Sequence, residues 1–132
     1  MGRYVLDTSA FLCYLRDESG ADFVYEILSS RESENFMHRV NLGEIYYGIL
    51  RRDGERKANE VYGFLVQYPV RYLEDLGDPF LVTVARLKVR YGLGFADSFA
   101  AATAVLNNAV LVTKDNDFRP LERKGIVKIR WL

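Results

Sequence analysis

The chain has 132 residues, of which 49% are hydrophobic and 27% are charged, which excludes a disordered polypeptide and predicts one folded domain over residues 1–132. Eighteen acidic residues balance eighteen basic ones, so any contact with a nucleic acid must come from a local basic patch. The single cysteine excludes an intramolecular disulfide. With no secretory signal and no apolar run long enough to cross a bilayer, the sequence predicts a cytoplasmic protein without a membrane segment.

The predicted elements alternate single strands with pairs of helices. In chain order they are a strand over 4–6, helices over 10–15 and 21–30, a strand over 35–38, helices over 41–52 and 55–68, a strand over 70–73, helices over 79–91 and 96–107, a strand over 110–112, a short irregular or helical piece over 120–124 and an edge-type strand over 127–130. Asp78 is expected to cap the helix that begins with Pro79. This alternation predicts an α/β fold with a central, mainly parallel sheet flanked by helices.

Five carboxylates stand out because each lies at a predicted strand end or near a helix start. They are Asp7, Glu44, Asp97, Asp115 and Asp117. A parallel sheet gathers the carboxyl ends of its strands along one edge, and ligands bind in the crevice at that edge. Carboxylates that repel one another usually imply a cation, and hard oxygen ligands favour Mg²⁺ or Mn²⁺. The pattern therefore indicates a metal site suited to phosphodiester chemistry.

Each carboxylate also has a simpler structural interpretation. Asp7 is a suitable N-cap, and Glu44 suits an exposed position near a helix N-terminus, where the dipole favours negative charge. Asp97 fits a cap or first-turn position, and Asp115 with Asp117 fits an Asx-type turn. The sequence leaves these alternatives open for each residue taken alone.

Four segments together resemble the PIN-domain ribonucleases, specifically the VapC toxins of toxin–antitoxin pairs. The matching segments are 4–9 (YVLDTS), 41–48 (NLGEIYYG), 94–102 (GFADSFAAA) and 111–118 (LVTKDNDF). The resemblance implies a Rossmann-like α/β/α domain. It also implies an endoribonuclease that depends on Mg²⁺ or Mn²⁺ and hydrolyses RNA with a metal-activated water.

The resemblance assigns roles to individual residues. Asp7, Glu44 and Asp97 match the core catalytic carboxylates, Asp115 matches the fourth acidic position, and Asp117 matches a less constant one. All five are expected as metal ligands, and the first four as catalytic residues. Supporting hydroxyl groups are expected from Thr8, Ser9 and Thr113. The implied partners are an RNA substrate, a second copy in a homodimer and a VapB-type antitoxin.

Basic residues near these segments are candidates for contact with RNA phosphates, although a solvated surface explains them equally well. They are Arg51, Arg52, Lys114 and Arg119. Two neighbouring functions stay open: a PIN-domain nuclease of RNA processing outside a toxin–antitoxin pair, and a catalytically silent nucleic-acid-binding module. A phosphorelay receiver is disfavoured because no acidic pair ends the first strand. A haloacid-dehalogenase-like phosphatase is disfavoured because Ser9 stands where that class needs a second aspartate.

Overall fold

The centre of the molecule is a sheet of five parallel strands in the order β3-β2-β1-β4-β5. The computed structural model describes residues 2–132, and its strands are β1 (Arg3–Leu6), β2 (Glu34–His38), β3 (Arg71–Leu73), β4 (Val110–Thr113) and β5 (Ile129–Trp131). From β1 the chain builds β2 and β3 on one side, then returns to build β4 and β5 on the other. The order of the strands therefore reverses between β1 and β4, which is where open α/β sheets bind ligands.

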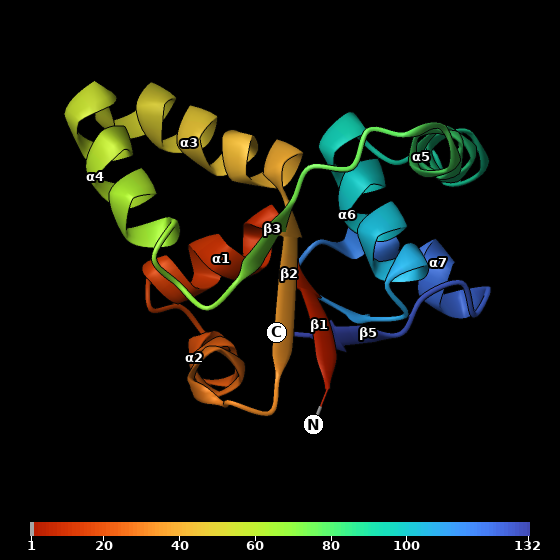
Figure 1. Ribbon diagram of the computed structural model, residues 1–132, viewed down its shortest axis with the longest axis horizontal. Helices are drawn as coiled ribbons and strands as arrows, with labels where there is room; N and C mark the ends of the chain where they lie inside the picture. The colour runs from red at the N-terminus through yellow and green to blue at the C-terminus, as the bar shows by residue number, and fades with distance from the viewer. Residues whose placement is uncertain (1) are drawn as a thin grey trace.

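Helices cover both faces of this sheet (Figure 1). They are α1 (Thr8–Leu15), α2 (Ala21–Ser29), α3 (Arg39–Asp53), α4 (Glu55–Leu65), α5 (Asp78–Tyr91), α6 (Phe95–Leu106) and α7 (Arg119–Arg123), with a 3₁₀ turn, η1, at Asn116–Phe118. In Figure 1, α1 to α4 lie on one side of the sheet and α5 to α7 on the other. None of the described helices has both the length and the apolar character needed to span a bilayer.

Alternation along the strands divides the core into two layers. Residues that point to α5 and α6 alternate with residues that point to α1, α2, α3 and α4. The first set on the three central strands is Val5, Phe36 and Leu111, and the second set is Leu6, Met37 and Val112. Because both faces are buried, these strands read as continuous apolar runs, as parallel strands should.

The predicted α/β architecture is confirmed, although several elements begin or end up to three residues from their predicted bounds: the helices expected from 10 and 41 begin at Thr8 and Arg39, and the last strand is Ile129–Trp131 instead of 127–130. Two further ends differ. The helix expected to reach Tyr68 ends at Leu65, and the chain then forms tighter turns in which the N–H groups of Gln67 and Tyr68 donate to the backbone oxygens of Phe64 and Leu65. The cap of α5 is Gly77, not Asp78, which is the first residue of that helix. Neither difference moves a carboxylate named above.

A core substitution tests the two-layer packing. Leu111 is fully buried, and Leu111→Ala should lower the free energy of unfolding by about 2–5 kcal/mol because it leaves a cavity beside β1 and β5. Leu106→Ala is the matched control, because that side chain is 48% exposed and its truncation should cost much less. Denaturant titration of both variants measures the difference, and equal losses would contradict the assigned packing.

Candidate functional site

The site is built around the buried carboxylate of Asp7, which directly follows β1. Asp7 is the N-cap of α1: its Oδ1 accepts hydrogen bonds from the backbone N–H of Ala10 and from Ser9 Oγ, each at 2.8 Å. Its Oδ2 accepts a hydrogen bond from Thr113 Oγ1 at 2.6 Å. Because Thr113 ends β4, this bond joins the ends of two neighbouring strands at the point where strand order reverses. Asp7 thus takes its predicted capping role and also lies within the site.

The same two hydroxyl groups position the loop after β4. Ser9 Oγ accepts a hydrogen bond from the backbone N–H of Lys114 at 3.0 Å, and Thr113 Oγ1 accepts one from the backbone N–H of Asp115 at 2.9 Å. Each hydroxyl therefore donates to Asp7 and accepts from the chain that follows β4. The placement of Asp115 follows directly from the way Asp7 is held.

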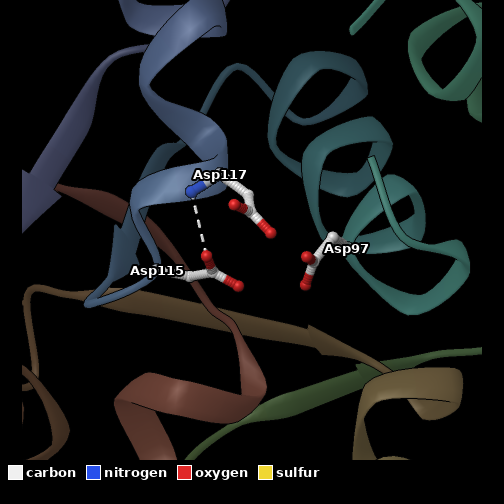
Figure 2. Close-up of side chains that lie close together, drawn as sticks. All are labelled: Asp97, Asp115 and Asp117. Atoms are coloured by element: carbon white, nitrogen blue, oxygen red, sulfur yellow. Dashed lines mark hydrogen bonds between the residues drawn. The ribbon is translucent and has the colours of Figure 1, made fainter. Parts of the chain in front are cut away.

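Three carboxylates converge where that loop meets the start of α6. Asp97, Asp115 and Asp117 each offer an oxygen atom, and these atoms all lie within 4.8 Å of one another. Figure 2 shows Asp97 pointing from the start of α6 toward the two loop aspartates. Asp115 also caps η1 by accepting a hydrogen bond from the backbone N–H of Asp117 at 2.9 Å, so the predicted Asx-type turn is present too. Such a group of hard oxygen donors matches the preference of Mg²⁺ and Mn²⁺.

Glu44 joins the site from α3 through Thr8. The Thr8 hydroxyl donates to the Glu44 carboxylate, and it also lies 3.3 Å from the backbone oxygen of Asn41. Asn41 is fully buried, and its Nδ2 donates to the backbone oxygen of Ala96 at 3.0 Å, beside Asp97. Sequence reasoning did not include Asn41 among the site residues. Its place one turn before Glu44 on the same helical stripe is the pattern that indicates it.

The electrostatics show that these carboxylates act on one another. Burial raises the pKa of Asp7 from its ordinary value of 3.8 to about 6, against the opposing hydrogen bond from Thr113. Burial also raises the pKa of Asp97 to about 7, and the negative charges of Asp115, Asp7 and Glu44 add to this effect. Asp7 and Glu44 are not members of the group within 4.8 Å, but their charges reach it. Without a cation, the site holds more negative charge than it can easily stabilise.

The two predicted RNA contacts nearest the carboxylates have partners within the protein. Lys114 Nζ lies 3.7 Å from a carboxylate oxygen of Glu18, and the Arg119 guanidinium lies 4.5 Å from the ring centroid of Trp131. Arg119 is exposed and directly follows η1 in the chain. Contact of either residue with RNA stays a prediction.

The other two basic candidates lie at the far end of α3. Arg51 is seven residues beyond Glu44, which corresponds to about 10 Å along the helix axis. Its guanidinium stacks on the ring of Tyr47 at 4.9 Å, and Arg52 Nε lies 3.9 Å from an oxygen of Asp53. Both arginines are exposed, so their predicted contact with RNA would extend along α3 away from the carboxylates.

This arrangement can be compared with known proteins. The PIN domain family model matches residues 4–124, almost the whole chain. The chain belongs to the PIN domain family. The expected resemblance is thus confirmed for the family and its α/β fold. No curated protein sequence matches the chain significantly.

Solved structures with the same fold include toxin–antitoxin proteins. A chain of VapBC2 from Rickettsia felis, solved bound to a promoter DNA fragment, is 17% identical with a TM-score of 0.73, and the alignment covers 98% of each chain. VapC20 of Mycobacterium tuberculosis, described as a sarcin-ricin loop cleaving toxin, is 20% identical with a TM-score of 0.71, with 96% of this PIN domain and 98% of VapC20 covered. PAE2754 from Pyrobaculum aerophilum is 22% identical with a TM-score of 0.68, over 97% and 89% of the two chains. At these identities the likeness shows the fold.

The raised pKa of Asp97 predicts that its charged form lowers the free energy of unfolding of the metal-free PIN domain, and that this effect depends on pH. The folded state holds this proton more tightly than the unfolded state, so the stability contribution present at low pH is lost as the pH rises through about 7. At pH 8, Asp97→Asn should therefore raise the free energy of unfolding by roughly 1–2 kcal/mol, allowing for the partial exposure of the side chain. The gain should be smaller at pH 5, where the folded wild-type protein already carries the proton.

Denaturant titrations in EDTA at the two pH values measure this effect. Asp22→Asn is the control: Asp22 is an exposed acid in the first turn of α2, so its replacement should give no gain. A stability gain that does not change with pH would show that Asp97 is not destabilised by its charge.

Proposed function

We propose that this PIN domain is a metal-dependent endoribonuclease of the VapC type. The observation that carries the proposal is the group formed by Asp97, Asp115 and Asp117 at the point where strand order reverses, with Asp7 beside it. Family membership supports it, because the matched region includes all three converging carboxylates. The similar fold of VapC20, described as a sarcin-ricin loop cleaving toxin, supports RNA as the substrate class.

The residues present fit a divalent cation. Asp97, Asp115 and Asp117 would hold it, with Asp7 and Glu44 supplying further negative charge from either side. When bound, Mg²⁺ or Mn²⁺ lowers the pKa of a coordinated water and neutralises charge on a scissile phosphate. The raised pKa of Asp97 is consistent with this fit, because burial and then the neighbouring negative charges raise it, and a cation would relieve the repulsion between those charges.

The protein's own residues fix the orientation of these carboxylates. Oδ1 of Asp7 already accepts two hydrogen bonds and Oδ2 accepts one, so its free acceptor capacity lies on Oδ2. Thr8 holds Glu44 in the same manner from the first residue of α1. The predicted supporting roles of Thr8, Ser9 and Thr113 thus correspond to hydrogen bonds with the carboxylates. Hydrolysis by water, without attack by the ribose 2′-hydroxyl, would leave a 5′-phosphate and a 3′-hydroxyl.

A VapB-type antitoxin and a second copy of the chain are the proposed partners. Several proteins of the same fold come from complexes described as VapBC or toxin–antitoxin, which supports an antitoxin partner. A PIN nuclease of RNA processing is the neighbouring alternative. A short antitoxin-like reading frame beside the gene would favour the toxin, and its absence would favour the alternative. RNA binding without metal-dependent cleavage would instead favour a silent binding module.

Replacing one central carboxylate should abolish metal binding and cleavage without unfolding the domain. Asp97→Asn should abolish Mn²⁺ binding and RNA cleavage, because it removes a donor and a charge from the group, while the domain stays folded. Calorimetric titration of Mn²⁺ and end-group analysis of cleaved RNA measure the two effects, with Asp22→Asn as the control. Wild-type-like cleavage by Asp97→Asn would refute the assignment of this residue. Products ending in 2′,3′-cyclic phosphate would refute hydrolysis by water.

The salt dependence of RNA binding tests the basic residues separately from catalysis. In a background of Asp97→Asn, which prevents turnover, replacing Arg51 and Arg52 by alanine should weaken RNA binding and flatten its salt dependence. Each lost phosphate contact should reduce the slope by about 0.7 for single-stranded RNA. Arg119→Ala tests the region beside η1 in the same way. An unchanged slope in either variant would remove that region from the RNA-binding surface.

A further inference from the structure

His38 is a buried histidine that connects the helices surrounding the carboxylates. It is the last residue of β2 and the N-cap of α3, and it is only 2% exposed. Its Nδ1 accepts a hydrogen bond from the backbone N–H of Val40 at 3.1 Å. Its Nε2 lies 2.9 Å from the backbone oxygen of Asp75, in the segment between β3 and α5. Both ring nitrogens are therefore engaged by the backbone.

These two contacts allow one protonation state of the ring. The N–H of Val40 can only donate, so Nδ1 must be unprotonated. The backbone oxygen of Asp75 can only accept, so Nε2 must carry the proton. A proton on Nδ1 would face the N–H of Val40 and remove the cap of α3. The contacts of His38 thus fit the tautomer that carries its proton on Nε2.

The faces of the ring contact two further helices. His38 stacks on Phe80 of α5, with ring centroids 5.0 Å apart and planes 14° apart. It also packs against Phe99 of α6, with centroids 5.0 Å apart at a tilt of 55°. Phe99 is two residues after Asp97 on the same helix. One side chain therefore contacts α3, α5, α6 and the segment that precedes α5.

His38 contacts the two helices that carry Glu44 and Asp97, and these carboxylates come from different layers of the core. Glu44 lies six residues beyond His38 on α3, or about 9 Å along the helix axis, while Asp97 lies on α6. A hydrogen bond from Asn41 to the backbone oxygen of Ala96 forms a second connection between the same helices. The start of α3 is therefore held relative to α6 by the ring contact of His38, the hydrogen bond of Asn41 and the packing of Val40 against the α5–α6 layer.

We propose that His38 is a positioning residue that sets α3, and with it Glu44, relative to Asp97 on α6. The proposal rests on the metal-dependent function above, because it assigns His38 a role in the geometry of that site. His38 does not contact the carboxylates itself. It acts through the cap of α3 and through its stacking on the helices beside it.

Two substitutions separate the contacts of the ring. His38→Asn places an amide oxygen near the position of Nδ1, so it keeps the cap of α3 but cannot reach Asp75. His38→Gln places its amide nitrogen near the position of Nε2, so it keeps the bond to Asp75 and loses the cap. Asn35→Ala is the control, because it removes a buried hydrogen bond, to Ile27, from the opposite end of β2.

Mn²⁺ affinity and the kinetics of RNA cleavage distinguish positioning from stability. His38→Gln should weaken Mn²⁺ binding by about 10-fold or more and lower kcat with little change in KM, as expected when support of a metal site is lost. His38→Asn keeps the cap but loses the ring contacts with Phe80 and Phe99, so it should lose less Mn²⁺ affinity than His38→Gln. Asn35→Ala should lose stability but keep wild-type Mn²⁺ affinity. Nitrogen-15 NMR of the imidazole should show an unprotonated Nδ1.

The possible contrary results have different meanings. Wild-type Mn²⁺ affinity and kcat in His38→Gln would overturn the positioning role alone, as would an equal loss in Asn35→Ala, which would show a general effect of stability. A protonated Nδ1 would also overturn it. Absence of both Mn²⁺ binding and RNA cleavage in the wild-type protein would overturn the proposed function, and the role of His38 with it.

Discussion

The buried carboxylate of Asp7 is the constraint on which the arrangement of the site depends. A carboxylate without water needs several donors, and Asp7 obtains them from the start of α1 and from the end of β4. The hydroxyls of Ser9 and Thr113 donate to Asp7 and at the same time accept from the backbone N–H groups of Lys114 and Asp115, which follow β4. Satisfying one buried charge therefore determines the path of the loop that carries Asp115. The order of the strands brings these elements together, and the hydrogen bonds fix their atomic positions.

The same arrangement leaves the carboxylates in an unfavourable electrostatic state. Three hydrogen bonds do not offset the burial of Asp7, whose pKa is still raised to about 6. Asp97 is affected more strongly, because the charges of Asp115, Asp7 and Glu44 add to its burial. Local conflicts of this kind are expected at functional sites and are compensated elsewhere in the fold. Here the compensation comes from two apolar layers, and a divalent cation that binds only the folded state would add to it.

The sequence predicted the architecture because its evidence is local. Apolar strands, helix breaks and acidic residues at strand ends are all visible within a few positions of one another, and together they indicated one edge of a parallel sheet. The capping role of Asp7 and the turn at Asp115 were also foreseen, and both occur inside the site. The connections between helices were not foreseen. The bond from Asn41 to Ala96 joins residues 55 positions apart, and such a contact is set by packing, which no short pattern records.

Lys114 and His38 show the same limit: their partners in the fold are not visible in the local sequence. The sequence displays Lys114 as a free cation beside an aspartate, whereas the fold places it near Glu18 of the α1–α2 connection. His38 ends a short strand and has no motif beside it, so the sequence alone does not indicate its role. Its contacts with Asp75, Phe80 and Phe99 exist only after β3, α5 and α6 have assembled around it. The residues that a local pattern reveals are those that carry charge, while those that set the spacing between charges appear only in the fold.

The two layers of the core meet at this site. Glu44 comes from α3, whose apolar face packs with α1 and α4, whereas Asp97 comes from α6 on the opposite face of the sheet. Packing within each layer does not by itself set the distance between these two carboxylates, because the sheet separates most of the two layers. Above the carboxyl edge of the sheet, the Asn41 hydrogen bond, the His38–Phe99 ring contact and the packing of Val40 connect α3 directly to α6. The spacing of the carboxylates therefore depends on a few contacts between layers whose stability comes from separate hydrophobic cores.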